Sequence, residues 1–275
     1  MASPALQLPK GSFLTDRRDS WWLSPTIMAG VLVLFSLYVG WALFFGGESY
    51  KFGHYISPMF GPELPESFTN ALNWPSGVTP ALLLIWAPFG FRATCYYARK
   101  VYYRSFFTNP PACAVDGVDV NRGSPKLDRS GVSLFQGGYR GEYRFPFILN
   151  NLHRYFLYAA ILLMLSHWFE LLFAFQFDGG IGVGVGTLFL LADVMALTLY
   201  VTSCHAFRNL IGGGRNNFCC SGTRKVQHKG WRLVSRLNER HHVWFWVSIT
   251  TVILADLYIR LLSWGVVEDL YFVLF

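Results

Sequence analysis

Five long stretches of this chain consist almost entirely of apolar residues. They cover residues 22–46, 80–103, 147–175, 181–207 and 243–265. Each is long enough for the roughly 20 helical residues that a hydrocarbon layer requires, although Arg92 and Cys95 interrupt the second one. The pattern predicts an all-α fold, an integral membrane bundle of five transmembrane helices that takes up residues 1–275 as a single domain.

The polar segments between these stretches differ in length. Residues 47–79 and 104–145 are long connections, and the second is long enough to suggest a function of its own. The Asp-Gly-Gly sequence at 178–180 leaves only a tight turn between the third and fourth stretches, which predicts antiparallel neighbours. In residues 225–240, apolar side chains recur at near-helical spacing among basic ones, as expected of a helix that lies on the membrane surface.

Basic residues are distributed very unevenly along the chain. Of the 23 lysines and arginines, all except Lys51 and Arg260 lie in the amino-terminal segment or within 92–154 and 208–240. The positive-inside rule therefore predicts a cytoplasmic amino terminus and an external carboxyl terminus. The first stretch exceeds a signal-peptide core and lacks a small-residue cleavage site, so we expect it to remain as the first helix.

Composition and net charge fit the same picture. Hydrophobic residues make up 53% of the chain and charged residues only 14%, which excludes an ordinary soluble domain. The net charge of +7 could suggest nucleic acid. Here topology explains it, together with contact to anionic lipid or an acidic partner, so no nucleic-acid partner is expected.

Soft metal ligands gather at the predicted cytoplasmic ends of the helices. They are Cys95, Cys113, Cys204, His153, His205, His241 and His242. Cytoplasmic thiols seldom form disulfides, so metal ligation and inert burial are the interpretations that remain. Cys219 and Cys220 lie in a polar loop near His228, and we expect these three to bind no metal.

Two kinds of redox centre could use these ligands. A Rieske-type [2Fe–2S] cluster takes two thiolates on one iron and two imidazoles on the other, and it is favoured although the usual C-x-H and C-x-x-H spacing is absent. Its four ligands are expected among Cys95, Cys113, Cys204, His153, His205 and His241. The alternative is haem b held by two of the histidines. A second haem at His167 would have only His54 as a partner, and zinc would have no reason to be buried in the membrane.

A quinone would need hydrogen-bond donors for its two carbonyl oxygens and an aromatic wall beside its ring. Such residues surround the predicted metal region, where they could equally serve as interface anchors. The candidates are Arg92, Tyr96, Tyr97, Arg154 and Tyr155. Three acidic residues within the helices, Glu170, Asp193 and Asp256, suggest either proton transfer or polar contacts between helices.

Four motifs support a resemblance to a known family. They are R-A-T-C-Y-Y-A-R-K-V-Y-Y-R at 92–104, P-P-A-C at 110–113, F-P-F-I-L-N-N-L-H-R-Y at 145–155 and S-C-H-A-F-R-N-L-I-G-G at 203–213. With these motifs and five predicted helices, the chain from Trp22 onward resembles the single membrane-anchor subunit of an actinobacterial-type succinate dehydrogenase or fumarate reductase, respiratory complex II.

This resemblance implies a multi-pass protein of the bacterial plasma membrane that belongs to a succinate dehydrogenase (quinone) complex. The anchor would dock an iron–sulfur subunit and an FAD-containing flavoprotein subunit on its cytoplasmic face, and complexes could assemble into a higher-order oligomer. Succinate would be oxidised on the partner's flavin, and electrons would reach quinone through the membrane centre. Better-known members bind haem b, but the cysteines and the few outer histidines here depart from a two-haem pattern.

Two other classes of function compete with this interpretation. A transporter or channel subunit would need ionisable residues along a path through the bilayer, and these are sparse in the sequence. A pure scaffold would anchor an enzyme without holding a cofactor, and the purified protein would then be colourless and free of iron.

Overall fold

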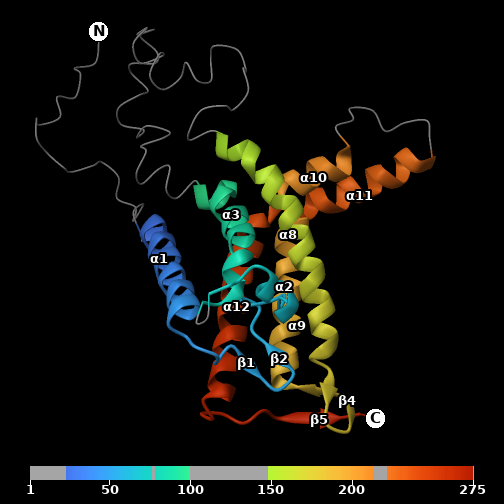
Figure 1. The fold of residues 1–275 in the computed structure, drawn as a ribbon. Helices are drawn as coiled ribbons and strands as arrows, with labels where there is room; N and C mark the ends of the chain where they lie inside the picture. Colours follow the sequence, from blue (N-terminus) through green and yellow to red (C-terminus); the bar gives the residue numbers. More distant parts are fainter. Residues whose placement is uncertain (1–22, 76–77, 100–147, 214–221, 275) are drawn as a thin grey trace, which may run out of the picture.

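Four long helices form the body of the molecule. The computed structural model describes residues 23–75, 78–99, 148–213 and 222–274, and Figure 1 shows how the elements are arranged. The long helices are α1 (Leu23–Phe44), α8 (Ile148–Phe173), α9 (Val185–Thr202) and α12 (His241–Ser263). By length and composition, all four can cross a membrane. They confirm four of the five predicted membrane segments, with ends that differ by a few residues.

The predicted second membrane segment is not one long helix in the part that the structure describes. It begins with the 3₁₀ helix η1 (Pro80–Leu83), which is followed by the short helix α3 (Trp86–Thr94). At Cys95 the backbone leaves the helical region, with φ −61° and ψ 139°. This segment therefore does not confirm a fifth continuous span, and the break turns the Cys95 sulfur toward α12.

A close contact with α8 holds α3 in the bundle. A Cβ at Gly90 would overlap the ring of Phe156 on α8, so a residue with a side chain could not take this position without a shift. Elsewhere, α12 packs along α9, and α8 packs against both α3 and α9. The end of α3 is thereby placed next to the first turns of α8 and α12.

Two shorter helices mark one end of the bundle, the α10 end. α10 (His205–Gly212) has Cys204 as its N-cap and ends at Gly213, whose φ of 59° lies in the left-handed region. α11 (Gly222–Glu239) packs against α10 and extends sideways from the bundle in Figure 1. The helix predicted for residues 225–240 is thus present.

Short strands and turns occupy the opposite end, the hairpin end. The strands are β1 (Lys51–Phe52), β2 (Tyr55–Ile56), β3 (Gln176–Phe177), β4 (Gly180–Gly184) and β5 (Tyr271–Val273), and the loop after β2 carries the short helix α2 (Glu66–Ala71). β1 pairs with β2, and β4 lies between β3 and β5, all antiparallel. The β3–β4 hairpin, in which Phe177 faces Gly180, confirms the tight turn predicted at 178–180.

Tyr55 ties the two hairpins to the start of α9. Its hydroxyl donates to Asp269 Oδ2 over 2.7 Å and lies 3.2 Å from Thr187 Oγ1. Burial raises the pKa of Tyr55, so the hydroxyl keeps its proton and remains a donor. A Cβ at Gly186 would lie 2.6 Å from the tyrosine ring, so the glycine permits this packing.

A buried ion pair on α12 fixes the hairpin end to α1. Arg260 Nε donates to Asp256 Oδ2 over 2.8 Å, and both side chains are fully buried. Tyr38 on α1 and Ser57 in the loop also donate to this carboxylate, while Arg260 Nη1 donates to Ser49 Oγ over 2.8 Å. Because every charge here has partners, the geometry fits the polar helix contact that was one of the two interpretations of Asp256.

Candidate functional site

Two buried cysteine–histidine pairs lie at the α10 end of the bundle. Cys95 Sγ lies 3.5 Å from His241 Nε2, and Cys204 Sγ lies 3.1 Å from His153 Nε2. The four residues come from the end of α3, the second turn of α8, the junction of α9 with α10, and the start of α12. None is more than 8% exposed. The structure thus brings together four of the six predicted metal ligands.

A hydroxyl group orients each imidazole of these pairs. Thr94 Oγ1 lies 2.9 Å from His153 Nδ1, and Ser203 Oγ lies 2.7 Å from His241 Nδ1. Each hydroxyl donates its proton to a backbone carbonyl of its own helix, so it accepts a hydrogen bond from Nδ1–H. The tautomer inferred from these bonds leaves the lone pair on Nε2, facing a cysteine sulfur. Metal-binding histidines are commonly oriented in this way by a second partner.

The two pairs interlock through neighbouring residues in the sequence. Thr94 precedes Cys95 but bonds the histidine that faces Cys204. Ser203 precedes Cys204 but bonds the histidine that faces Cys95. One hydroxyl–cysteine dipeptide on each side therefore takes part in both pairs, and the four cysteine and histidine side chains are referred to together as the ligand cluster.

Both cysteines occupy breaks between helical segments. Cys204 has φ −63° and ψ 141°, close to the values at Cys95. Each cysteine is followed by a helical segment, residues 96–99 after Cys95 and α10 after Cys204. Cys204 Sγ accepts a hydrogen bond from the backbone N–H of Ala206 over 3.3 Å. Free N–H groups at the start of a helix favour a thiolate, the form in which cysteine binds metal.

Two aromatic rings separate the ligand cluster from a cavity. Phe91 stacks on His153 with ring centroids 4.7 Å apart, and Tyr200 stacks on His241 at 5.1 Å. Both aromatic residues also line the cavity. Tyr200 is completely buried, and its hydroxyl has no hydrogen-bond partner among the described residues. The cavity therefore ends at these two aromatic rings, which stack on the two imidazoles.

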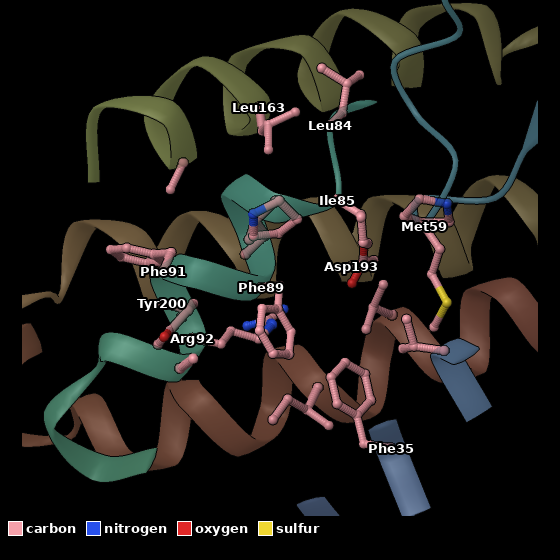
Figure 2. Close-up of a pocket in the computed structure, with 18 of the residues that line it drawn as sticks. Phe35, Met59, Leu84, Ile85, Phe89, Phe91, Arg92, Leu163, Asp193 and Tyr200 are labelled. Carbon is pink, nitrogen blue, oxygen red and sulfur yellow. The ribbon is translucent and has the colours of Figure 1, made fainter. Parts of the chain in front are cut away.

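The cavity has a volume of about 330 Å³ and is lined mainly by apolar side chains of α1, α3, α8, α9 and α12. Figure 2 shows Phe91 and Tyr200 at one end and Met59 at the other. Three ionisable residues are in the lining, namely Arg92, Asp193 and His167. Arg92 Nη1 donates to Ser248 Oγ over 3.1 Å, and Asp193 accepts a hydrogen bond of 2.9 Å from Thr251 on α12.

The remaining candidate residues lie elsewhere. Cys113 falls outside the described residues, as do Cys219 and Cys220, while His205 and His242 are exposed. Of the five quinone candidates, Arg92 lines the cavity and Tyr97 contacts the His241 ring at 5.6 Å. The other three, Tyr96, Arg154 and Tyr155, are exposed.

Four residues that shape the site were missed in the sequence. They are Thr94, Ser203, Phe91 and Tyr200. The repeated hydroxyl–cysteine dipeptide was visible as T-C at 94–95 and S-C at 203–204. The stacking rings had no such signal, because aromatic residues are common throughout this chain.

The donor atoms meet in pairs rather than in larger groups. Within the described ranges, no three His, Cys, Asp or Glu side chains are placed to hold a single metal ion. The sulfur–nitrogen distances of 3.5 and 3.1 Å are those of two hydrogen-bonded cysteine–histidine pairs.

Comparison with known proteins gives two matches. The family described as actinobacterial succinate dehydrogenase subunit SdhC matches residues 23–265. A similar solved structure is a chain of the Mycobacterium smegmatis Sdh1 complex in the apo form, with 33% sequence identity and a TM-score of 0.76. The similarity covers 98% of this chain and 98% of that chain. No curated protein matches the chain.

Proposed function

Because this chain belongs to the actinobacterial succinate dehydrogenase subunit SdhC family, we propose that it anchors the complex and delivers electrons from succinate oxidation to quinone. As an SdhC subunit it is a multi-pass protein of the bacterial plasma membrane. Its partners are an iron–sulfur subunit and an FAD-containing flavoprotein subunit, on which succinate is oxidised. They dock at the α10 end, where the basic residues of α11 gather.

The proposed cofactor of this subunit is a Rieske-type [2Fe–2S] cluster. The two interlocked cysteine–histidine pairs carry this proposal, with Cys95 and Cys204 as thiolate ligands and His153 and His241 as imidazole ligands. When bound, such a centre exchanges one electron at a potential raised by its histidine ligands. The hydrogen bonds that His153 and His241 donate to the Thr94 and Ser203 hydroxyls hold the imidazoles in a ligating orientation.

Haem b is less well supported as the cofactor. The Nε2 atoms of the two buried histidines at the α10 end, His153 and His241, each face a cysteine sulfur rather than a second imidazole. At the hairpin end, His54 and His167 border a cavity of only about 80 Å³. Ligand sites for organic molecules usually have roughly 300–1,000 Å³.

The larger cavity is the proposed quinone site. Its volume of about 330 Å³ and its apolar lining suit a quinone ring and the start of its tail. Arg92 can donate to one carbonyl oxygen, and Phe91 and Tyr200 provide aromatic walls on the side of the metal ligands. Arg92 is thereby retained from the sequence-based candidates, and Tyr97 lies behind His241 rather than in the lining.

Electron paramagnetic resonance of the purified complex tests this proposal. We expect a reduced signal with a low average g and no haem band in a pyridine assay. His241→Ala should abolish the signal and succinate-driven quinone reduction, while reduction of a soluble artificial acceptor by the partner subunits continues.

The neighbouring residue provides a matched control. His242 is exposed, whereas His241 is buried, so His242→Ala should retain the signal and the quinone activity. A haem band in the wild-type complex, or an unchanged signal in His241→Ala, would show that this cofactor assignment is wrong.

A further inference from the structure

We propose that Glu170 and His167 carry protons from the hairpin end of the bundle to the cavity, so that quinone is reduced with protons from the side opposite the metal ligands. This proposal rests on the proposed function, because it assumes that quinone binds in the cavity. The overall step is Q + 2e⁻ + 2H⁺ → QH₂, with electrons supplied by succinate oxidation on the partner subunits.

His167 belongs to two cavities at once. It lines the large cavity on one side and the small cavity of about 80 Å³ on the other, together with Pro58. The small cavity is also lined by Glu170 and His54. His167 therefore lies between the proposed quinone site and a smaller cavity at the hairpin end, whose lining includes the Glu170 carboxyl group.

The protonation pattern of His167 suits a proton acceptor. Its Nε2 lies 3.0 Å from the carbonyl oxygen of Pro58, so Nε2 must carry the proton in the neutral ring. Nδ1 then carries the lone pair, is fully buried and has no hydrogen-bond partner among the described residues. It lies 3.8 Å from Glu170 Oε2, a distance that one water molecule or a small rotation of the side chain can bridge.

Glu170 connects this histidine to the hairpin surface. Its side chain is 23% exposed, and Oε1 accepts a hydrogen bond of 3.3 Å from the backbone N–H of Glu63. A Cβ at Gly61 would overlap the Glu170 carboxylate, and Gly61 itself lines the large cavity. One carboxyl group is thus in reach of solvent and of the cavity wall.

The transfer needs only these two side chains. Protonated Glu170 donates its proton to His167 Nδ1, which gives an imidazolium with a proton on each nitrogen. The imidazolium then gives a proton to reduced quinone in the cavity. The proton leaves either from Nε2, once the hydrogen bond from Nε2 to the Pro58 carbonyl has broken, or from Nδ1, once the ring has rotated. Other titratable groups facing this region are Arg92 and Asp193 in the large cavity, His54 in the small cavity, and Glu63, which is paired with Lys51.

Proteoliposomes allow the side of proton uptake to be measured. Succinate added outside reaches only complexes whose soluble subunits face outward, so the hairpin end of every active complex faces the lumen. With a short-tailed quinone and a pH indicator trapped inside, we expect the lumen to become alkaline during turnover of the wild-type complex. No lumenal proton uptake by an active wild-type complex would overturn the proposal.

Variants then test the two residues. Glu170→Gln keeps the shape and the hydrogen bond from Glu63 but cannot release a proton, so we expect lumenal uptake to be lost and quinone reduction to fall on the order of 10-fold or more. His167→Gln should behave in the same way. Glu170→Asp, which retains a carboxyl group, should recover most of both activities.

Asp178→Asn is the matched control, because Asp178 is an exposed carboxylate at the same end and should not affect uptake. The metal signal after succinate addition should be the same in all these variants. If Glu170→Gln takes up lumenal protons as the wild type does, the path is wrong. The same holds if this variant turns over slowly but still takes its protons from the lumen. If the wild-type complex did not reduce quinone at all, the result would instead contradict the proposed function itself.

Discussion

The Ser203 hydroxyl holds His241 through a 2.7 Å hydrogen bond to Nδ1. Ser203→Ala leaves this buried N–H without an acceptor and frees the ring to turn away from Cys95. We expect the affinity for iron to fall roughly 10- to 100-fold, as for other partners of metal-binding histidines. Iron retained by the purified complex during titration with a chelator measures this loss.

Thr202→Val is the appropriate control for this substitution. Thr202 is the adjacent residue, and its hydroxyl donates only to the backbone of α9, over 2.6 Å to the Thr198 carbonyl. Iron retention should therefore match the wild type. Equal retention in Ser203→Ala would mean that the hydroxyl has no positioning role.

At the scale of single residues, the sequence predicted that cysteines and histidines gather at one end of the bundle, but not which of them meet. Cys95, Cys204, His153 and His241 come from four segments that are far apart in the chain. Helical spacing does not show which face of a helix points inward when nearly all of its residues are apolar. His205 was an equal candidate for that reason, although it is exposed at the start of α10.

At the scale of elements, the position of α3 decides whether the two pairs can form. Gly90 allows α3 to approach Phe156 on α8. Gly90→Ala should push the two helices apart and destabilise the subunit by about 1–3 kcal/mol, as expected of overpacking. Because the end of α3 carries Thr94 and Cys95, we also expect weaker iron binding, measured with the thermal stability of the purified complex.

Gly40→Ala is a control of the same chemical size. A Cβ at Gly40 in α1 would meet nothing within 4 Å, so stability and iron content should stay near those of the wild type. If Gly90→Ala matched Gly40→Ala in both measurements, the close contact of α3 with α8 would not be needed for the site.

The break at Cys95 shows what hydropathy cannot predict about an element. Residues 80–103 are apolar enough to suggest a continuous helix. The interruption depends instead on contacts with α8 and α12, in which Thr94 and Cys95 bond histidines of those helices. Long, uniformly apolar helices such as α9 and α12 were predictable because their length alone is decisive.

At the scale of the whole molecule, the three parts of the proposed site follow one another along the bundle. The metal ligands lie at the α10 end, the cavity begins at Phe91 and Tyr200, and His167 borders the cavity toward the hairpin end. The uneven distribution of lysine and arginine along the chain predicted which connecting segments lie together at each end of the bundle. The cavity itself could not be predicted, since it arises from five elements packed together.

The orientation of this axis in the membrane is the last testable point. Among the basic residues in the described part of the chain, only Lys51 and Arg260 lie toward the hairpin end, and Arg260 is neutralised there by Asp256. In Figure 1, α1 starts at the α10 end and the chain finishes at the hairpin end. In a bundle that crosses a membrane, the start of α1 and the carboxyl terminus would therefore lie on opposite sides of that membrane. The positive-inside rule predicts that the hairpin end faces the exterior. We therefore expect alkaline phosphatase fused to the carboxyl terminus to be active and a fluorescent protein fused there to be dark, with the reverse at the amino terminus. Fluorescence at the carboxyl terminus would place the hairpin end in the cytoplasm, and Glu170 would then draw protons from the same side as succinate oxidation.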